Sequence, residues 1–535
     1  MFNFFRKRKY RDYDFNPDEV FMDTINVSGL DTQQFEGVIE KPISRKSLLL
    51  FGLFFVLVFI IFTVKLIDLQ IINGADFFAK SENNTLRSSP LFAERGVIYD
   101  RHDVELAWNQ DSETEKDFLN RAYIREPGFG HILGYVNYPQ QDNSGNYWRD
   151  EIAGQAALEK KYNKELQGNN GSLLFEVDAI GKVISENSIT APVDGVNIHT
   201  TLDARLQTYM YQAIESQATE FGFDAGAGAI MNIHSGELLT LTSYPEYDPY
   251  TLAEGQDSEK ISGFFNDPQK PFLNRAISGL YSPGSTVKPF LALAALHEGL
   301  ITKNTKIKSV GSIEIPNIYN PNNASVFKDW RSGGHGITDV RFAIADSVNT
   351  FFYAIGGGYK DQEGLGITKI EKYLRSFDIA AKTNIDFGVE QDGTIPSPAW
   401  KKENYTDGAW RLGDTYITSI GQFGFLVSPI QMLRATAALA NDGILHEPLL
   451  VKKNAVSKSI SEDILFEHYQ TIRAGMRDTV TQGSAQNINV DYIDIAAKTG
   501  TAQVGVNNEF YNSWIIGFFP YHDPQYAFTI VMEHA

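Results

Sequence analysis

An uncharged apolar stretch near the start of the 535-residue chain constrains its fold more than any other feature. Ser47–Val64 reads SLLLFGLFFVLVFIIFTV, eighteen residues without a charge. As an α-helix rising about 1.5 Å per residue, it would span roughly 27 Å, close to the hydrocarbon thickness of a bilayer. It has no polar face, which argues against a core helix of a soluble protein. Its length and late position argue against a cleaved signal peptide. The sequence therefore predicts a transmembrane helix over residues 46–67.

The basic residues around this stretch predict its orientation. Those ahead of it are Arg6, Lys7, Arg8, Lys9, Arg11, Lys41, Arg45 and Lys46. After Lys65, the next basic residue is Lys80. Because the cytoplasmic flanks of membrane helices are enriched in lysine and arginine, we expect a single-pass anchor in the cell membrane, with a cytoplasmic N-terminus and an extracytoplasmic body.

Composition excludes several classes of protein. Lys and Arg number 47 against 66 Asp and Glu, a formal charge of −19, which argues against nucleic acid as a partner. The chain has no cysteine, so disulfide and thiol chemistry are excluded. It contains no H-E-x-x-H, GxxxxGK[ST] or GxGxxG motif, and its histidines show no ligand spacing. We therefore expect neither a catalytic metal nor a cofactor.

The rest of the chain divides by the pattern of its residues. Residues 1–45 are polar and without a sustained period, which indicates a largely flexible cytoplasmic tail. Residues 68–193 mix short strands such as GVIYD and SLLFEVDA with turn-rich segments, and predict an extended α+β module. Residues 194–535 would form a larger domain.

Several elements of this larger domain can be placed from their periodicity. ARLQTYMYQAIESQATEFG is helix-periodic, and strand-like runs, NIHTTLD and AGAIMNI, lie on either side of it. Ser428 and Pro429 supply the N-cap and first residue of a second helix, with Gly443 expected at C′. Near the end, NSWIIGFF and YAFTIVM predict an antiparallel hairpin. The fold class expected is α+β.

Ser285 and Lys288 form the candidate catalytic pair. They stand three residues apart in SPGSTVKPF, so both would lie on one face where a helix starts after a Pro-Gly turn. A serine hydroxyl needs a base to act as a nucleophile, and unpaired N–H groups at a helix start favour developing negative charge. A lysine serves as that base only if its pKa falls, through burial or a nearby cation, for which Lys498 is the candidate. The second S-x-x-K, Ser325–Lys328, lacks the turn-to-helix context.

Two further motifs follow in order. Ser347-Val348-Asn349 is weak alone, because Ser-x-Asn also occurs at Ser81, Ser144 and Ser185. Lys498-Thr499-Gly500 occurs once, directly before the terminal hairpin, so we expect it on a neighbouring strand where its glycine lets a ligand backbone approach. S-x-x-K, S-x-N and K-T-G in this order are the set found in penicillin-binding proteins and class A β-lactamases.

Over most of residues 46–535 the chain resembles the class B penicillin-binding proteins, the membrane-anchored D,D-transpeptidases that cross-link peptidoglycan. The segments that carry the resemblance are Arg95–Arg101, which matches the pedestal motif R-G-x-I-x-D-R, then His131–Val136, Gly154–Glu159, Thr201–Asp203, Lys328–Gly336 and Gly413–Gln422. The last two look most like the elongation type, penicillin-binding protein 2. The resemblance implies an anchor, a pedestal (dimerisation-type) domain over 68–193 and, over 194–535, a transpeptidase domain with a penicillin-binding/β-lactamase-like antiparallel sheet flanked by helices.

The resemblance also implies a reaction and its residues. Ser285 would attack the D-Ala–D-Ala bond of a stem peptide, with Lys288 as general base, and an amine of a second stem peptide would take the acyl group. The other implied site residues are Ser347 and Asn349 for proton relay and orientation, Lys498 for positive potential, Thr499, Gly500 and Thr501 for the substrate carboxylate, and the backbone N–H groups of Ser285 and Thr501 for the oxyanion.

The resemblance implies partners as well. A polytopic glycan polymerase of the shape, elongation and division family would contact the apolar helix and the pedestal, and β-lactams would act as covalent inhibitors. The alternatives are a division-type transpeptidase, a β-lactam-hydrolysing or β-lactam-sensing protein of the same fold, and a non-catalytic scaffold.

The chain departs from the family pattern in four places. Only twenty-one residues separate Asn109 from His131, where the elongation type carries a longer head insertion that contacts scaffold proteins. Phe423 stands where glycine is common, and the cysteine of a zinc site known in some relatives is absent. The chain also stops at Ala535 inside a strand-like run, which suggests a truncated C-terminus. For Arg95 and Asp100 of the pedestal motif we expect a structural ion pair.

Overall fold

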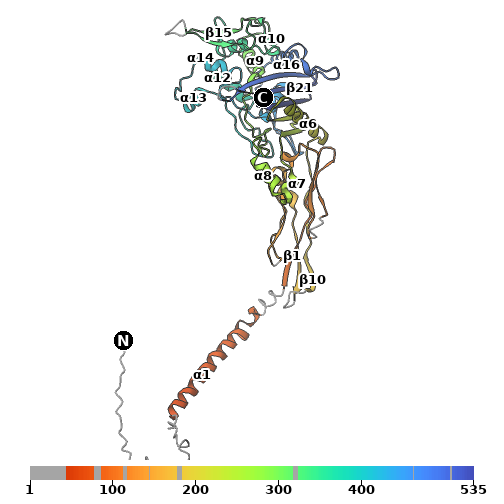
Figure 1. Cartoon of the computed structure of the whole chain (residues 1–535), viewed down its shortest axis with the longest axis vertical. Coiled ribbons are helices and arrows are strands. Elements are labelled where there is room, and N and C mark those ends of the chain that lie inside the picture. The colour runs from red at the N-terminus through yellow and green to blue at the C-terminus, as the bar shows by residue number, and fades with distance from the viewer. Residues whose placement is uncertain are drawn as a thin grey trace, which may run out of the picture. The chain divides into compact units, whose positions relative to one another are not determined.

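The computed structural model describes residues 44–77, 86–111, 117–143, 145–177, 183–316, 323–461, 463–505 and 509–534. The chain forms two compact units, residues 1–85 and 86–535 (Figure 1). The expected flexible tail lies almost wholly outside the described residues.

The first unit contains the apolar helix. Helix α1 covers Arg45–Ile67, begins at the N-cap Ser44, whose hydroxyl accepts from the Ser47 N–H, and continues into a π-helical turn, η4, at Asp68–Ile72. None of the residues of α1 is buried, and the helix is long and apolar enough to cross a membrane. This fits the predicted single-pass anchor.

The second unit begins with the pedestal, built of short strands and short helices. One antiparallel sheet has the order β1 (Leu86–Leu91), β9 (Gly171–Val177), β10 (Val183–Thr190). A second, mixed sheet has the order β11 (Ile198–His199), β2 (Ile98–Tyr99), β3 (Glu105–Gln110), β4 (Asn120–Tyr123), in which β11 runs parallel to β2 and the other pairs are antiparallel. Two small ladders pair β5 (Val136–Asn137) with β8 (Ala153–Gly154) and β6 (Gln140–Gln141) with β7 (Tyr147–Arg149). The helices are α3 (Gly130–Leu133), α4 (Ala157–Lys161) and α5 (Asn163–Gln167). Of the run NIHTTLD, only β11 is strand.

The expected ion pair between Arg95 and Asp100 is wrong. Arg95 instead pairs with Glu159 at 2.6 Å, and Arg121 binds the other oxygen of the same carboxylate at 2.7 Å. Asp100 accepts two backbone N–H groups of its own turn and the N–H of Ala204. Both residues are structural, because a fully buried carboxylate needs its charge balanced and its lone pairs filled, which the two arginines do for Glu159.

The rest of the second unit is organised around a five-stranded antiparallel sheet. Its order is β13 (Leu238–Tyr244), β12 (Ala225–Asn232), β22 (Tyr526–Glu533), β21 (Phe510–Phe519), β20 (Ala496–Val504). Helix α6 (Ala204–Phe221) packs on one face, and α15 (Pro429–Ala440) lies with the main core on the other. The expected hairpin is β21–β22, and the K-T-G motif lies on the neighbouring strand β20, as predicted.

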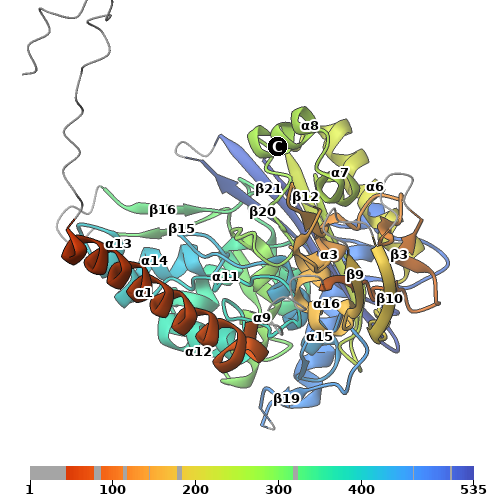
Figure 2. The same cartoon turned by 90° about the horizontal axis from the view of Figure 1, so that it is seen from below.

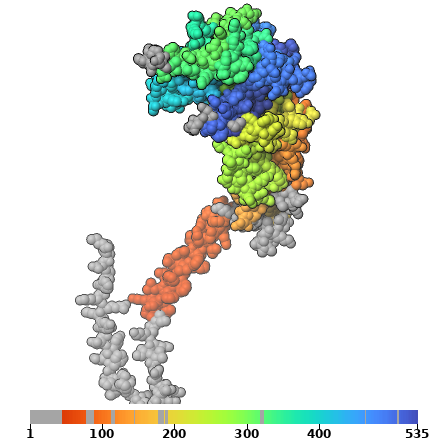
Figure 3. Space-filling view, turned by 45° about the horizontal axis from the view of Figure 1, so that its top comes forward, coloured from red at the N-terminus to blue at the C-terminus, as the bar shows by residue number. Residues whose placement is uncertain are grey.

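The remaining elements surround this sheet (Figure 2). The helices are α7 (Pro249–Glu254), α8 (Ser258–Asn266), η5 (Gly284–Val287), α9 (Lys288–His297), α10 (Val340–Ala345), α11 (Asn349–Gly357), α12 (Gly366–Ser376), α13 (Pro398–Asn404), α14 (Leu412–Thr418), α16 (Phe466–Thr481) and η6 (Gln486–Ile488). The paired short strands are β14 (Ile307–Ser309) with β17 (Gly336–Thr338), β15 (Ser312–Ile315) with β16 (Ser325–Lys328), and β18 (Ile444–His446) with β19 (Ser457–Ser459). Figure 3 shows the green-to-cyan middle segments and the blue C-terminal segment as one continuous body.

Helix α15 shows how closely a boundary can be predicted. Ser428 is its N-cap with a capping box closed by Gln431, and Pro429 is its first residue, as expected. Its end differs by one position, because the C-cap is Asn441 and Asp442, at φ +50°, takes the left-handed C′ position expected for Gly443. Aspartate adopts this conformation more readily than most residues, so the glycine is not needed there.

Candidate active site

The candidate nucleophile lies on a tight turn packed against the edge strand of the sheet. Ser285 is in the 3₁₀ turn η5, which leads directly into α9. A Cβ added to Gly284 would lie 2.9 Å from the carbonyl oxygen of Thr501, and one added to Gly500 would lie 2.9 Å from the carbonyl oxygen of Pro283. The close approach at Gly500 is therefore made by the nucleophile turn, whereas the sequence suggested a ligand. Glycine at both positions lets β20 lie against Ser285.

A cleft of about 1000 Å³ opens over this turn. Of the residues predicted from the sequence, it is lined by Ser285, Ser347, Asn349, Thr499 and Thr501. The remaining walls include Lys328, Asp329, Trp330, Tyr353, Ile417, Ile420, Gln422, Ser484, Gln503 and Tyr511. The structure thus brings three motifs that are distant in sequence to one cleft.

The two lysines of the motifs are fully buried and share one hydroxyl. Lys288 Nζ donates to Asn349 Oδ1 at 2.6 Å, to the carbonyl oxygen of Ser347 at 2.8 Å and to Ser347 Oγ at 3.2 Å. Lys498 Nζ donates to the same Oγ at 3.0 Å and to the carbonyl oxygen of Thr499 at 2.7 Å. No hydrogen bond joins Lys288 to Ser285 among the residues described, so the contact expected from their spacing is replaced by one to the S-x-N motif.

Burial lowers the pKa of both lysine amines. It lowers the pKa of Lys288 well below its usual value of 10.5, and the nearby charge of Lys498 lowers it further. Burial also lowers the pKa of Lys498 from 10.5 to about 7. A lysine without its proton is a base, so this pair meets the electrostatic requirement for activating a hydroxyl.

Comparisons with known proteins identify the family of this chain. A family model of the penicillin-binding protein transpeptidase domain matches residues 226–535, and one of the penicillin-binding protein dimerisation domain matches residues 113–200. The chain belongs to the penicillin-binding protein transpeptidase family. The family and the fold class predicted from the sequence are thereby confirmed.

Within this family, the chain is similar to MrdA proteins and to solved structures of penicillin-binding protein 2. The peptidoglycan D,D-transpeptidase MrdA of Haemophilus influenzae is 28% identical over 501 residues, which cover 86% of this chain and 74% of that protein. MrdA of Escherichia coli is 28% identical over 575 residues, 88% of each chain. A solved complex of penicillin-binding protein 2 with MreC from Helicobacter pylori superposes with a TM-score of 0.70 at 28% identity, over 84% of this chain and 95% of that one. Pseudomonas aeruginosa penicillin-binding protein 2 in complex with WCK 5153 gives 0.67 at 27%, over 84% and 93%.

Sequence reasoning did not identify every residue at the site of this penicillin-binding protein. Ser484 lines the cleft beside β20, where its Oγ is 2.6 Å from Thr499 Oγ1. Gln422 lines the cleft from the loop after α14, whose Gly421 carbonyl accepts the Gly284 N–H at 3.0 Å. No local motif marks Ser484, whereas Gln422 lies in a segment that already carried the family resemblance.

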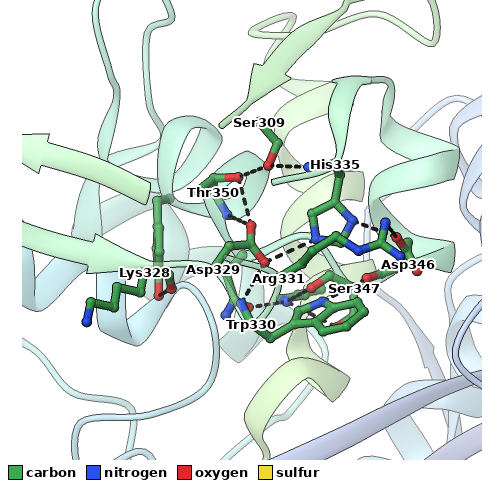
Figure 4. A network of polar contacts seen from close by, with 12 residues as sticks. Ser309, Lys328, Asp329, Trp330, Arg331, His335, Asp346, Ser347 and Thr350 are labelled. Carbon is green, nitrogen blue, oxygen red and sulfur yellow. Dashed lines mark hydrogen bonds and ion pairs between the residues drawn. The ribbon is translucent and has the colours of Figure 1, made fainter. Parts of the chain in front are cut away.

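Two carboxylates and one imidazole beside the cleft do not form a metal site. His335 Nδ1 is 2.5 Å from Asp346 Oδ2, while His335 Nε2 is 3.3 Å from Asp329 Oδ1 (Figure 4). Because opposite ring nitrogens face the two carboxylates, one ion cannot bind all three groups. Within the described parts of the chain, no group of three or more His, Cys, Asp or Glu residues is suited to hold a metal.

The buried Lys498 leads to a prediction on stability. Since its folded pKa of about 7 lies below the unfolded value near 10.5, the unfolded chain binds the extra proton between these values. The free energy of unfolding should therefore rise with pH from about 7 to about 10, by about 1.4 kcal/mol per pH unit from this group. Lys498→Met should flatten the slope by this amount and raise stability most at pH 7 and below. Urea unfolding of the full chain in detergent at several pH values measures it; an unchanged slope would contradict the burial of a chargeable ammonium.

Phe423 occupies a backbone position that favours glycine. Its φ is +69°, and its ring lies 5.6 Å from those of Trp400 and Tyr405 and 5.9 Å from that of Trp410, centroid to centroid. Lys401 Nζ lies 5.5 Å from the same ring. A left-handed conformation costs about 1–2 kcal/mol for a side-chain-bearing residue, and each aromatic pair contributes about 0.5–1.5 kcal/mol. The aromatic cluster therefore offsets the backbone strain of the loop that contacts the nucleophile turn.

Two substitutions of Phe423 separate the backbone strain from the ring contacts. Phe423→Gly should destabilise the protein by on the order of 2 kcal/mol, since lost ring contacts outweigh relieved strain. Phe423→Ala should cost about 1 kcal/mol more than Phe423→Gly, because it loses the contacts and keeps the strain. Urea unfolding of both variants tests this order, and an alanine variant as stable as the glycine variant would show that the strain is absent.

Proposed function

We propose that this chain is a peptidoglycan D,D-transpeptidase of the elongation type, acting in cell-wall elongation and shape maintenance. The observation that supports it best is the Ser347 hydroxyl, which binds two buried lysines and lines one cleft together with Ser285. The similarity to MrdA proteins favours the elongation type. Among the residues that the structure describes, no contact in the cleft favours a β-lactam-hydrolysing, a division-type or a non-catalytic role.

The reaction is two acyl transfers on one serine. Ser285 Oγ attacks the carbonyl carbon of the penultimate D-Ala, Lys288 accepts the hydroxyl proton, and the peptide bond breaks as the proton passes to the departing D-Ala amine. An amine of a second stem peptide then attacks the Ser285 ester, gives up a proton, and releases the serine with its hydroxyl restored. No metal or cofactor takes part in this scheme.

The other residues serve charge and orientation. Ser347 Oγ, in contact with both ammonium groups, carries protons between the lysines and the cleft, and Asn349 fixes Lys288. Thr499 and Thr501 bind the terminal carboxylate from the exposed face of β20, while Gly500 admits the nucleophile turn. The N–H groups of Ser285 and Thr501 stabilise the oxyanion, because fixed donors aimed at developing charge cost no reorganisation during the reaction.

The proposal includes the membrane arrangement and the partners. The tail rich in Arg and Lys is cytoplasmic and the cleft is extracytoplasmic. A polytopic glycan polymerase contacts α1 and the pedestal around Arg95–Arg101, and supplies the glycan whose stem peptides are cross-linked. The relative from Helicobacter pylori was solved in complex with MreC, so a shape protein of that kind is a second partner, with contacts altered by the short head between Asn109 and His131.

The test of function uses the full chain in detergent. Supplied with polymerised lipid-linked disaccharide peptide, it should release D-Ala and produce cross-linked dimers of stem peptides, both prevented by prior treatment with penicillin. The penicillin acyl-enzyme should persist for hours. Release of hydrolysed penicillin within seconds would overturn the proposal in favour of a β-lactam hydrolase, and a chain that never becomes acylated would indicate a scaffold.

A further inference from the structure

The S-x-N motif is held in a conformation that its own sequence does not favour. Ser347 has φ +53°, a left-handed value that serine rarely adopts and that costs on the order of 1 kcal/mol or more. Such a residue persists only where its neighbours fix it. Its hydroxyl and carbonyl oxygens both bind Lys288, so its placement sets the geometry of the proposed base.

The residue before the motif is fixed by three side chains from the segment after β16. The carboxylate of Asp346 binds His335 Nδ1 at 2.5 Å and Arg331 Nη1 at 3.5 Å. The indole N–H of Trp330 donates to the backbone carbonyl of Asp346 at 3.1 Å. Figure 4 shows these groups gathered around Asp346 and Ser347.

The residue after the motif is fixed by the same segment. Asp329 Oδ2 accepts the backbone N–H of Thr350 at 2.9 Å and its hydroxyl at 2.8 Å, and Asn349 precedes it directly. Ser309 Oγ lies 2.8 Å from the oxygen of the same hydroxyl. The S-x-N triplet is therefore held from both ends.

His335 joins the two ends. Its imidazole lies between Asp346, which precedes Ser347, and Asp329, which holds Thr350. The side chains of His335 and Asp329 are fully buried, so water does not compete for the bond between them. The backbone N–H of His335 is itself held by Ser309 Oγ at 3.2 Å, which fixes the ring's attachment.

We infer that His335 is a positioning residue of the active site: by bridging Asp329 and Asp346, it holds Ser347 and Asn349 where they bind the amine of Lys288. The inference rests on the proposed function, in which Lys288 activates Ser285. His335 does not line the cleft and touches no reacting atom. Its loss should slow acylation while leaving non-covalent binding of penicillin nearly unchanged.

Three substitutions of His335 in the full chain test this role. His335→Ala removes both bonds and should lower the acylation rate constant on the order of 10- to 100-fold, since small misplacements of catalytic groups have effects of that size. His335→Asn places an amide donor near Asp346, and His335→Gln places one near Asp329. Because Asp346 is joined directly to Ser347, the asparagine variant should regain more of the rate than the glutamine variant.

Stopped-flow acylation by fluorescent penicillin gives the non-covalent dissociation constant and the acylation rate constant separately, and thermal unfolding gives stability. We expect the acylation rate constant to change while the dissociation constant stays within about 3-fold of the wild-type value. The order of the His335 variants by acylation rate should differ from their order by stability. Acylation rates that simply follow the folded fraction, or an alanine variant with a wild-type rate, would overturn the inference. Mass spectrometry of wild-type protein first locates the acyl group, so failure of Ser285 as nucleophile is distinguished from failure of the bridge.

Two further variants guard against loss of folding. The Trp330 ring is largely exposed, so Trp330→Phe keeps the fold and an aromatic ring beside His335, and removes the indole N–H that binds the Asp346 carbonyl. Because Trp330 also lines the cleft, its effect on the bridge is taken from the acylation rate constant and not from the dissociation constant. It should slow acylation about 2- to 10-fold, the effect of one lost hydrogen bond. His522→Ala removes an exposed histidine distant in sequence from the network and should leave the rate unchanged. A Trp330→Phe variant as fast as His522→Ala would show that Asp346 needs no fixing.

Discussion

Ser285→Ala is expected to abolish covalent labelling by fluorescent penicillin and to leave the fold intact. The hydroxyl is the proposed nucleophile, and among the described residues no hydrogen bond from its Oγ supports the surrounding turn. Alanine also suits the 3₁₀ turn η5, so the loss of free energy of unfolding should stay within about 0.5 kcal/mol, as for substitutions away from packed or bonded features. Gel fluorescence after incubation with the label, with thermal unfolding of the same sample, measures both effects.

The matched control is the other serine of an S-x-x-K pattern. Ser325 lies exposed on β16, and Ser325→Ala should label like the wild type. The two variants should differ in the same way in the cross-linking assay: Ser285→Ala should lose release of D-Ala, and Ser325→Ala should keep it. An acyl group found by mass spectrometry on any residue other than Ser285 would falsify the assignment.

Elements whose signals are local were predictable. Helix α1 follows from eighteen residues without a charge, and α6 from its helical period between Asp203 and Gly222. The start of α15 follows from Ser428 and Pro429. Each of these signals lies within the element it predicts, so no knowledge of the rest of the chain was needed.

Contacts between distant residues were not predictable in the same way. Arg95 and Glu159 are sixty-four positions apart, and nothing in either segment names the other as partner. The expected pairing of Arg95 with Asp100 relied on proximity in sequence, whereas the turn after β2 uses Asp100 to bind backbone N–H groups. Arg95 pairs with Glu159 because the fold, and not the sequence order, places that carboxylate next to it.

In the active site too, local motifs were predictable and contacts between distant residues were not. The order of S-x-x-K, S-x-N and K-T-G predicted which residues meet, but the sequence could not show how they meet. Helix spacing favoured a bond between Ser285 and Lys288, yet the amine of Lys288 turns to Asn349 and Ser347, fifty-nine or more positions away. His335 lies in the segment Lys328–Gly336 that carried the family resemblance, but its bridging role could not be predicted, because a single histidine between two carboxylates has no spacing rule.

Lys288→Arg is expected to lower the acylation rate constant by about 10²- to 10⁴-fold, the usual contribution of a general base. The substitution keeps a positive charge and hydrogen-bond donors at a site where Lys288 binds Ser347 and Asn349. A guanidinium does not give up its proton in proteins, whereas burial and the neighbouring Lys498 lower the pKa of the Lys288 amine well below its usual value. Acylation by fluorescent penicillin under single-turnover conditions measures the rate.

The same substitution at the second lysine supplies the control. Lys498 also binds Ser347 Oγ and is equally buried, so Lys498→Arg introduces a similar strain and a similar fixed charge. If Lys288 is the base and Lys498 supplies electrostatic support, Lys498→Arg should retain much more of the rate than Lys288→Arg, at comparable stability in urea. Near-normal acylation by Lys288→Arg would show that Lys288 acts only through its charge. Equal losses in the two variants would mean that the lysines and the Ser347 hydroxyl act as one unit, in which no single amine holds the role of base.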